Sequence, residues 1–338
     1  MNSIFLDTLK NKVTPRPPIW FMRQAGRILP DYQRLRKKYT FSELMQDPDL
    51  ASEVTLLPIN SLGVDAVILF SDILVVPEAL GMKLEFTDKG PIFHDPIDIN
   101  KPNRSFKKNM SMLNYIYRNI NKIKQKNSTI PLIGFCGGPL TVFCFMFKGD
   151  TKQKNFNKAI KFLYKYPEES HRILNLITEV SEYYVDEQIN HGIDCFQLFE
   201  TYCGLIPNDK YYSEILPYSK RILNRTKNKV PSIFFPKDYS MRLDVFNKSY
   251  CDFVSLDWSV NLLSARKVLD KNLGIQGNID PRLLYSDYNV IEKELKKLKS
   301  YNFQKNWIIN LGHGFLPDID YKKAKFIVEW VKKTNWNK

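Results

Sequence analysis

Short apolar runs recur along the whole chain, and nearly every one ends in polar or small residues. Runs of this length, separated by segments with helical spacing, predict buried strands that alternate with helices. In chain order, the predicted strands cover residues 19–22, 65–70, 131–135, 194–199, 232–235, 252–256, 273–276 and 307–311.

Helical periodicity is clearest in the segments between these runs. We predict helices over residues 31–38, 47–62, 109–126, 156–164, 168–191 and 211–225. Pro48 is compatible with the second of them, because proline is tolerated in a first helical turn. In the helix over 109–126, Met112, Ile116 and Ile120 are expected to share one face. Turn formers and short alternations over 78–103 predict an excursion with a small hairpin.

Eight strand and helix units close most simply into a (β/α)8 TIM barrel with insertions, and the chain length suits one such domain over residues 1–338. A doubly wound open sheet is the alternative. Polar residues directly after nearly every strand favour the barrel, because its strands all end at one shared rim. No linker, repeat or low-complexity segment divides the chain.

Composition narrows the class of protein. The chain has 338 residues, of which 43% are hydrophobic, enough for a large core. No apolar stretch approaches the roughly 18 residues of a membrane span, and no leader pattern is recognisable, so we expect no membrane partner and cytoplasmic residence. The five cysteines form no Cys-x-x-Cys pair and are expected to be buried, reduced thiols.

The formal net charge is +14, which raises nucleic acid as a partner. The lysines, however, are dispersed along predicted helices, and no arginine-rich tract accompanies them. We therefore expect solvated helix faces and no nucleic-acid partner. A diffuse positive field would still assist the capture of a polyanionic small molecule.

The loop after the first predicted strand carries the most distinctive chemistry. Arg23, Gln24 and Arg27 follow the apolar run directly, with Gly26 between them. Each arginine is a permanently charged fork suited to a carboxylate or phosphate, and glycine allows a ligand to approach the backbone closely. By spacing alone, two ordinary surface arginines in a loop would be the favoured interpretation.

Three later strand ends add candidates to the same rim. Asp72 follows the second strand, although an aspartate there could also be a helix N-cap. Gly137 and Gly138 follow the third strand, where they could cradle a ligand or simply form a tight turn. Thr201 follows the fourth strand and His313 the eighth.

Cofactor motifs are not recognisable in the sequence. It contains no phosphate loop or dinucleotide fingerprint. None of the four histidines belongs to a His-x-Cys or His-x-x-x-His pair, the spacings expected of zinc ligands. We therefore expect neither a metal nor a cofactor. A cationic loop with one carboxylate suits a polycarboxylate substrate that stabilises its own developing charge.

Several segments together resemble the uroporphyrinogen decarboxylase family. The sequence reads WFMRQAGR at 20–27, FSDILVVP at 70–77, GFCGGPLT at 134–141, QGNIDP at 276–281 and NLGHG at 310–314. The similarity extends over nearly the whole chain. It implies a homodimeric barrel that removes CO2 from the four acetate side chains of uroporphyrinogen III, giving coproporphyrinogen III without a cofactor.

The resemblance also implies roles for individual residues. Asp72 would stabilise the transition state, and Arg23 would relay a proton, by our preferred hypothesis through a water molecule. Substrate binding would involve Arg23, Gln24, Ala25, Gly26, Arg27, Asp72, Phe145, Thr201 and His313.

This sequence departs from the family pattern at several positions. Leu140 stands where an aromatic residue is usual, Phe145 where a tyrosine is usual, and Thr201 where serine is common; the turn at 235–238 also departs from the expected small residues. A catalytically weak or silent relative that binds porphyrinogen is therefore an alternative. A zinc-dependent methyltransferase on the same barrel is a second alternative, but it would need a histidine and cysteine zinc site.

Overall fold

The computed structural model describes residues 3–87, 90–149, 156–303 and 305–336. Its main sheet has seven parallel strands in the order β1-β4-β5-β6-β7-β8-β9. These strands are β1 (Val67–Ile68), β4 (Leu132–Gly137), β5 (Cys195–Glu200), β6 (Ser232–Pro236), β7 (Phe253–Ser255), β8 (Gly274–Gln276) and β9 (Trp307–Ile308). Neighbours in the sheet follow chain order, as they do in a barrel of repeated βα units.

The segment around Ile19 stands between the last and the first strand. Ile19 forms a parallel bridge with Ile309, and its carbonyl accepts a hydrogen bond from the Asp65 amide at 2.9 Å. The predicted (β/α)8 barrel is thereby confirmed. The predicted strand over 19–22 shortens to this single bridge, because Pro18 has no amide hydrogen to donate and a turn begins at Phe21.

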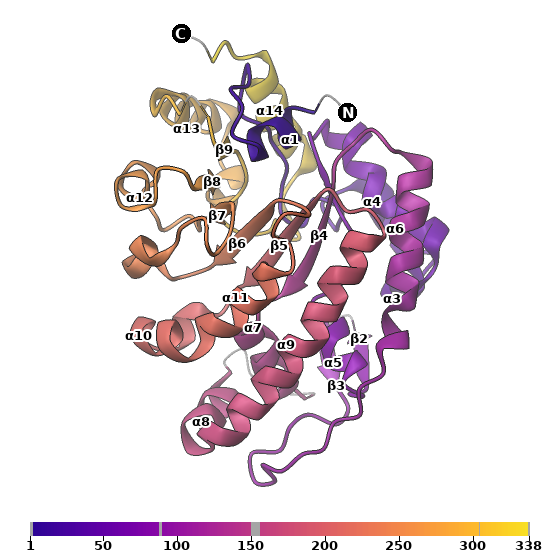
Figure 1. Cartoon of the computed structure of the whole chain (residues 1–338). Coiled ribbons are helices and arrows are strands. Elements are labelled where there is room, and N and C mark those ends of the chain that lie inside the picture. Colours follow the sequence, from indigo (N-terminus) through magenta and orange to yellow (C-terminus); the bar gives the residue numbers. More distant parts are fainter. Residues whose placement is uncertain (1–2, 88–89, 150–155, 304, 337–338) are drawn as a thin grey trace.

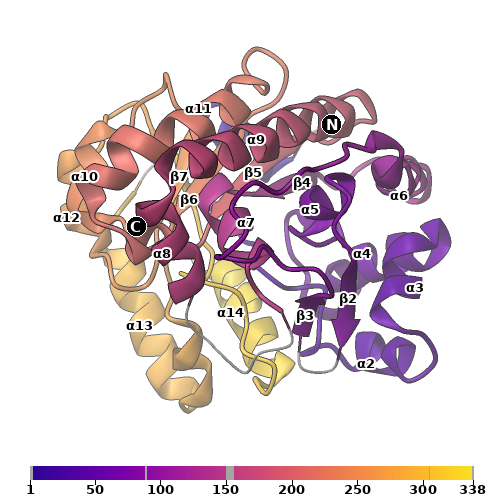
Figure 2. The same cartoon turned by 90° about the horizontal axis from the view of Figure 1, so that it is seen from below.

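Helices surround the strands in Figure 1 and form a ring in the view from below (Figure 2). They are α1 (Ile4–Leu9), α2 (Pro30–Arg36), α3 (Phe41–Gln46), α4 (Pro48–Leu62), α5 (Val75–Ala79), α6 (Asn114–Lys126), α7 (Pro139–Met146), α8 (Asn157–Lys165), α9 (Pro167–Asn190), α10 (Asn208–Lys210), α11 (Leu216–Asn224), α12 (Leu262–Val268), α13 (Tyr288–Ser300) and α14 (Tyr321–Lys333). Within the described ranges, none of them is both long and apolar enough to cross a membrane.

The predicted hairpin is confirmed in the excursion after α5. Strands β2 (Leu84–Thr87) and β3 (Gly90–Phe93) pair antiparallel and form a small separate sheet. In Figure 2 this hairpin lies at the end of the barrel where the strands terminate, close to the ring of helices.

The predicted helix over 109–126 is divided in the structure. A 3-10 turn, Met110–Leu113, precedes α6. Because a 3-10 turn winds more tightly than an α-helix, the expected common face is interrupted. Ile116 and Ile120 are buried as predicted, whereas Met112 is 46% exposed and Leu113 is buried in its place. Similarly, a π-helical turn, Tyr211–Ile215, precedes α11 in the predicted helix over 211–225.

The barrel interior includes a chain of polar side chains among its apolar ones. The Trp20 indole donates to Gln276 Oε1 at 3.0 Å, and Gln276 Nε2 donates to Gln197 Oε1 at 3.1 Å. These three side chains are fully buried. They tie the segment before the arginine loop to β8 and β5. All five cysteines are buried free thiols, as predicted.

Candidate active site

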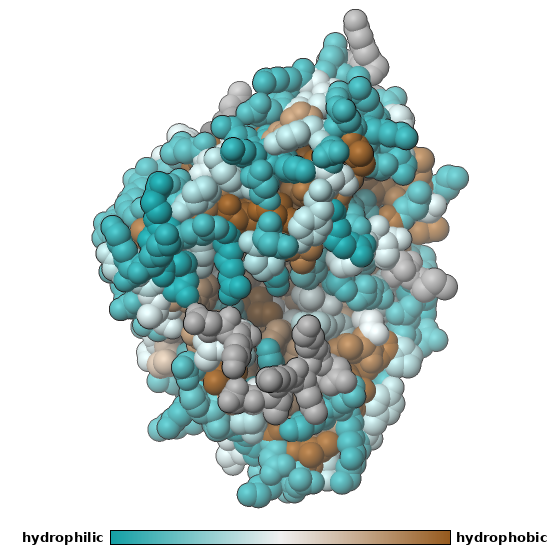
Figure 3. Space-filling view, turned by 180° about the vertical axis from the view of Figure 1, so that it is seen from behind, coloured by the Kyte–Doolittle hydropathy of each residue, from teal (hydrophilic) through white to brown (hydrophobic). Residues whose placement is uncertain are grey.

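A cavity of about 590 Å³ lies where the barrel strands end, a volume typical of small-molecule sites. Apolar side chains make up most of its wall, and seven residues with charged, hydroxyl or imidazole side chains also line it: Arg23, Arg27, Tyr32, Ser71, Asp72, Thr201 and His313. Seen from behind, the molecule is hollowed near its centre, with hydrophobic atoms inside the hollow and hydrophilic side chains around it (Figure 3).

The arginine loop forms one side of this cavity. Arg23, Ala25, Gly26 and Arg27 all line it. Neither arginine side chain forms an ion pair or hydrogen bond with any residue that the structure describes. Burial lowers the pKa of the Arg23 guanidinium from its usual value, while Tyr202 and Asp72 act in the opposite direction. Two cations that form no ion pair with a described residue therefore face one cavity, an arrangement suited to an anionic ligand.

Gln24 is placed differently from its neighbours. Its side chain is fully buried and does not line the cavity. Its Oε1 accepts from the Phe21 amide at 2.9 Å, and its Nε2 donates to the Ala66 carbonyl at 2.9 Å. These contacts fasten the arginine loop to the start of β1, so the side chain holds the loop from beneath.

Asp72 lies in the turn between β1 and α5 and lines the same cavity as the arginine loop. Its Oδ1 accepts a hydrogen bond from the Leu74 amide at 2.9 Å, a local contact within the turn before α5. Burial raises the pKa of Asp72 to about 6, although the Leu74 amide and Arg23 both favour the charged form. Of the two positions that the sequence allowed for it, Asp72 lines the cavity, and the helix N-cap is wrong because Leu74 holds the N-cap position of α5.

His313 follows β9 and packs among aromatic rings at the cavity wall. Its ring centroid lies 6.0 Å from that of Trp258 and 6.4 Å from that of Phe235. Burial lowers the pKa of His313 to about 4, with further lowering by Arg23 and Lys237. In the unliganded cavity the imidazole is therefore neutral near pH 7 and presents one N–H donor.

The wall next to Thr201 is aromatic. Phe145 from α7 contacts Phe156 and Tyr202 at centroid distances of 5.2 and 5.8 Å. Phe145 and Thr201 both line the cavity. The Phe145 ring therefore contributes apolar surface, and the Thr201 hydroxyl is the polar group that this wall offers.

The glycines after β4 make room for a protein side chain, not for a ligand. Neither Gly137 nor Gly138 lines the cavity. A Cβ at Gly138 would lie 2.6 Å from Glu200 Oε2. The fully buried Glu200 instead accepts hydrogen bonds from the Thr141 amide at 2.7 Å and the Leu140 amide at 3.2 Å. It caps the start of α7 and thereby fixes the helix that carries Phe145.

The structure also changes the interpretation of Leu140, one of the departures from the family pattern. Leu140 is fully buried in α7 and does not line the cavity, so the expected loss at the pocket does not occur there. Of the two departures in that segment, only Phe145 faces the cavity.

Sequence reasoning missed part of the site. Phe135, Phe199 and Phe235 from β4, β5 and β6 line the cavity. Their position at the ends of neighbouring strands was a usable signal. Ser71 was also missed; its Oγ is buried and has no hydrogen-bond partner in the described part of the chain. Its place directly before Asp72 was the signal for it.

Taken together, the fold and the site define a (β/α)8 barrel with one large apolar cavity whose charged groups are two arginines and one aspartate. Within the described residues, no group of three or more His, Cys, Asp or Glu side chains is arranged to hold a metal ion. The class of protein is thus a barrel whose cavity is suited to an organic molecule bearing several negative charges.

Comparisons with known proteins identify the family. The family described as Uroporphyrinogen decarboxylase (URO-D) matches residues 1–334. A curated uroporphyrinogen decarboxylase from Citrifermentans bemidjiense is 39% identical, covering 98% of this chain and 99% of the relative. One from Campylobacter jejuni, strain 81-176, is 41% identical with the same coverage. The chain belongs to the uroporphyrinogen decarboxylase family.

Solved structures agree on the fold. A methyltransferase from Methanosarcina mazei has a TM-score of 0.78 at 16% identity, covering 98% of this chain and 99% of that one. A B12-independent methionine synthase from Shewanella sp. W3-18-1 has a TM-score of 0.59 at 12% identity, with coverages of 87% and 89%. At such low identity the likeness concerns the barrel alone.

Proposed function

We propose that this chain catalyses the decarboxylation of the four acetate side chains of uroporphyrinogen III, giving coproporphyrinogen III and CO2 in tetrapyrrole biosynthesis. The observation that carries the proposal is the gathering of two unpaired arginines and one carboxylate in a single large cavity of a family member. The carboxylates of such a substrate would pair with the two arginines, and its pyrrole N–H groups would donate to the protein carboxylate.

The reaction needs no external electron acceptor. Protonation of the pyrrole carbon next to the acetate-bearing carbon creates an iminium. The electrons of the breaking C–CO2 bond flow into that iminium, and CO2 leaves. A proton then adds to the resulting exocyclic methylene, and the ring carbon returns its proton. For each side chain, one proton is consumed and one acetate becomes a methyl group.

Asp72 would stabilise the positive charge that develops during this reaction. With a pKa of about 6, it is mostly ionised near pH 7. Its carboxylate would accept hydrogen bonds from pyrrole N–H groups, and these bonds would strengthen as the ring becomes cationic. Its contact with the Leu74 amide holds it ready for this role.

The other cavity residues would bind and orient the substrate. Arg23 and Arg27 would pair with its carboxylates, and the backbone of Ala25 and Gly26 would shape the loop around them. His313 would donate its N–H to a further carboxylate, because the neutral imidazole still has one donor. Thr201 would add a hydroxyl, and Phe145 would pack against the macrocycle.

The proton for the first step would come from a water molecule relayed by Arg23. An arginine is a poor acid, with a pKa above about 12, but burial lowers the pKa of Arg23 in the helpful direction. The test is Arg23→Lys, which keeps the charge but changes the donor geometry. We expect a fall in turnover and a changed pH profile; near-normal turnover with an unchanged profile would contradict the relay.

We also propose that the chain acts as a single domain, forms a homodimer and works in the cytoplasm. One continuous hydrophobic cluster that includes residues from α1 to α14 supports the single domain. The dimer and the location are proposed from the resemblance to the family. Analytical ultracentrifugation of the purified chain would test the dimer directly.

The decisive experiment is anaerobic incubation of the purified protein with uroporphyrinogen III, without added metal or cofactor. Products are oxidised and separated by carboxylate number, with Asp72→Asn measured beside the wild type. We expect seven- to four-carboxylate products that are lost in the variant. A folded wild type that binds substrate but forms no product would instead indicate a silent relative.

A further inference from the structure

We propose that Gly314 and Asn310, in the segment after β9, are positioning residues for Arg23. The inference rests on the proposed function, in which Arg23 contacts the substrate. It concerns how the chain holds an arginine that no protein anion orients. Two separate contacts carry it, one to the backbone beside Arg23 and one along its side chain.

The backbone at Arg23 has an unusual conformation. Its φ is +63°, in the left-handed region that residues other than glycine seldom adopt. The preceding residue is held on both sides by the segment after β9. The Met22 amide donates to Asn310 Oδ1 at 3.0 Å, and the Met22 carbonyl accepts from the Phe315 amide at 3.3 Å. These contacts maintain the turn that directs Arg23 toward the cavity.

Asn310 is well suited to this task. Its side chain is fully buried, and the same Oδ1 also accepts from the Leu311 amide at 2.8 Å. One oxygen therefore joins the arginine loop to the segment that follows β9. No other side chain that the structure describes accepts a hydrogen bond from the Met22 amide.

Gly314 controls the path of the side chain itself. A Cβ at this position would lie 2.5 Å from Arg23 Cγ and 2.4 Å from Cδ, distances that would force the arginine to move. The φ of Gly314 lies outside the left-handed region, so an alanine backbone would be accepted there. Glycine is therefore required for space and not for its backbone freedom. The Arg23 stem lies across the place where a side chain would be.

Position matters because Arg23 has no ion pair among the described residues to orient it. A bidentate contact to a carboxylate needs a defined direction as well as a charge. Displacement of a binding group by about 1 Å can reduce turnover by about a hundredfold. The segment after β9 thus sets the geometry with which Arg23 meets the substrate.

The test is a double-mutant cycle with Gly314→Ala and Arg23→Ala. We expect Gly314→Ala alone to lower kcat/KM for uroporphyrinogen III by about 30-fold, because the arginine is displaced. In the Arg23→Ala background the clash disappears, so the same substitution should change kcat/KM by less than about twofold. Equal losses in both backgrounds, or no loss in either, would overturn the inference.

Asn310→Leu, taken through the same cycle, gives a second test that does not depend on how Gly314→Ala folds. We expect its loss in kcat/KM to shrink in the Arg23→Ala background as well. Asn119→Leu is the matched control, because Asn119 in α6 is equally buried and donates to the Met45 carbonyl in α3 at 2.7 Å, and neither residue lines the cavity. It should lower stability without changing kcat/KM. Gly149→Ala is the control for adding a methyl group.

Binding of uroporphyrin III, followed by fluorescence, separates this inference from the proposed function. If the wild type binds this porphyrin but turns nothing over, the proposed function fails. The positioning inference would then be decided by whether Gly314→Ala weakens porphyrin binding in the wild-type background and not in the Arg23→Ala background.

Discussion

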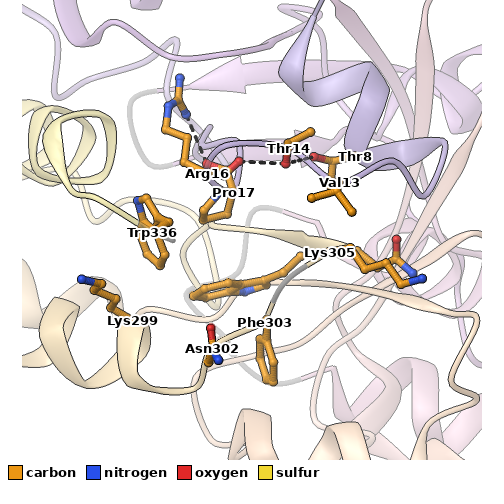
Figure 4. A pocket seen from close by; sticks show the side chains of 12 residues that line it. Thr8, Val13, Thr14, Arg16, Pro17, Lys299, Asn302, Phe303, Lys305 and Trp336 are labelled. Atoms are coloured by element: carbon orange, nitrogen blue, oxygen red, sulfur yellow. Dashed lines mark hydrogen bonds between the residues drawn. The ribbon is translucent and has the colours of Figure 1, made fainter. Parts of the chain in front are cut away.

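The two ends of the barrel use arginine in opposite ways. At the end where the strands begin, a pocket of about 30 Å³ is lined by residues that include Arg16, Trp307 and Trp336 (Figure 4). There Arg16 forms a two-point ion pair with Asp65, at 2.7 and 2.8 Å. At the end where the strands terminate, the cavity has a volume of about 590 Å³ and is thus about twenty times larger than the 30 Å³ pocket. Its two arginines form no ion pair with a described residue.

The difference shows which arginine serves the fold and which serves a ligand. Asp65 Oδ2 also accepts from the Ile19 amide at 2.8 Å, so the Arg16 pair fastens the segment that closes the barrel. A partly buried cation without an anion costs stability unless a ligand supplies the opposite charge. Arg23 and Arg27 are therefore expected to be neutral or unfavourable for stability and essential for substrate binding.

The largest expected effect comes from Asp72→Asn. We expect activity to fall by about a thousandfold, because the amide cannot stabilise a cationic ring. The free energy of unfolding of this variant should instead rise. The raised pKa of Asp72 means that its contribution to stability is full below pH 3.8 and is lost as the pH rises through about 6.

Asparagine does not ionise, so the variant avoids that loss. The cavity is open to solvent and Arg23 is nearby, which reduces the expected gain to about 1 kcal/mol. Urea unfolding should show a larger stabilisation at pH 8 than at pH 5. A variant that is less stable than the wild type at pH 8 would contradict this account of the carboxylate.

Arg23→Ala and Arg16→Ala should have crossed effects. We expect Arg23→Ala to lower kcat/KM by about a hundredfold, with little loss of stability, since no described residue pairs with it. Arg16→Ala should lower the free energy of unfolding by about 3 kcal/mol, because it leaves the buried Asp65 carboxylate with only the longer 3.8 Å ion pair to Lys332. Turnover by the folded fraction should be unchanged. Denaturant unfolding and steady-state kinetics on both variants would check this. A large loss of stability in Arg23→Ala, or of turnover in Arg16→Ala, would contradict the prediction.

The pH profile should sharpen the assignment of Asp72. We expect kcat/KM to fall on the acid side with an apparent pKa of about 6, as the carboxylate gains a proton and loses its charge. Below that pH the decline should approach about tenfold per unit. His313, with its pKa lowered to about 4, should not contribute to this limb. A profile that is flat between pH 5 and pH 7 would remove Asp72 from the essential groups.

The smallest expected effect concerns the apolar wall. Phe145→Tyr would add a phenol to a ring that lines the cavity. A new substrate hydrogen bond of about 1 kcal/mol corresponds to about a fivefold gain in kcat/KM. Phe156→Tyr is the control, because that ring contacts Phe145 at 5.2 Å without lining the cavity. An equal gain in both variants would show that the phenol does not act on the substrate.

The sequence by itself determined the strand and helix alternation and the family. Buried strands can be recognised in the sequence as apolar runs. If these strands form a barrel, the polar residues that follow them lie at one rim of it. For this reason Arg23, Arg27, Asp72, Thr201 and His313 could be predicted to converge without coordinates, and all five line one cavity.

Only the tertiary structure decided which neighbouring side chains face the cavity. Gln24 and Arg23 are adjacent in sequence, yet one is buried beneath the loop and the other lies across Gly314. Gly138 yields space to Glu200, and Leu140 turns into the core. Local sequence patterns specify elements, but the direction of a side chain in a loop depends on contacts between segments far apart in the chain. The Met22 and Asn310 contact is one of these.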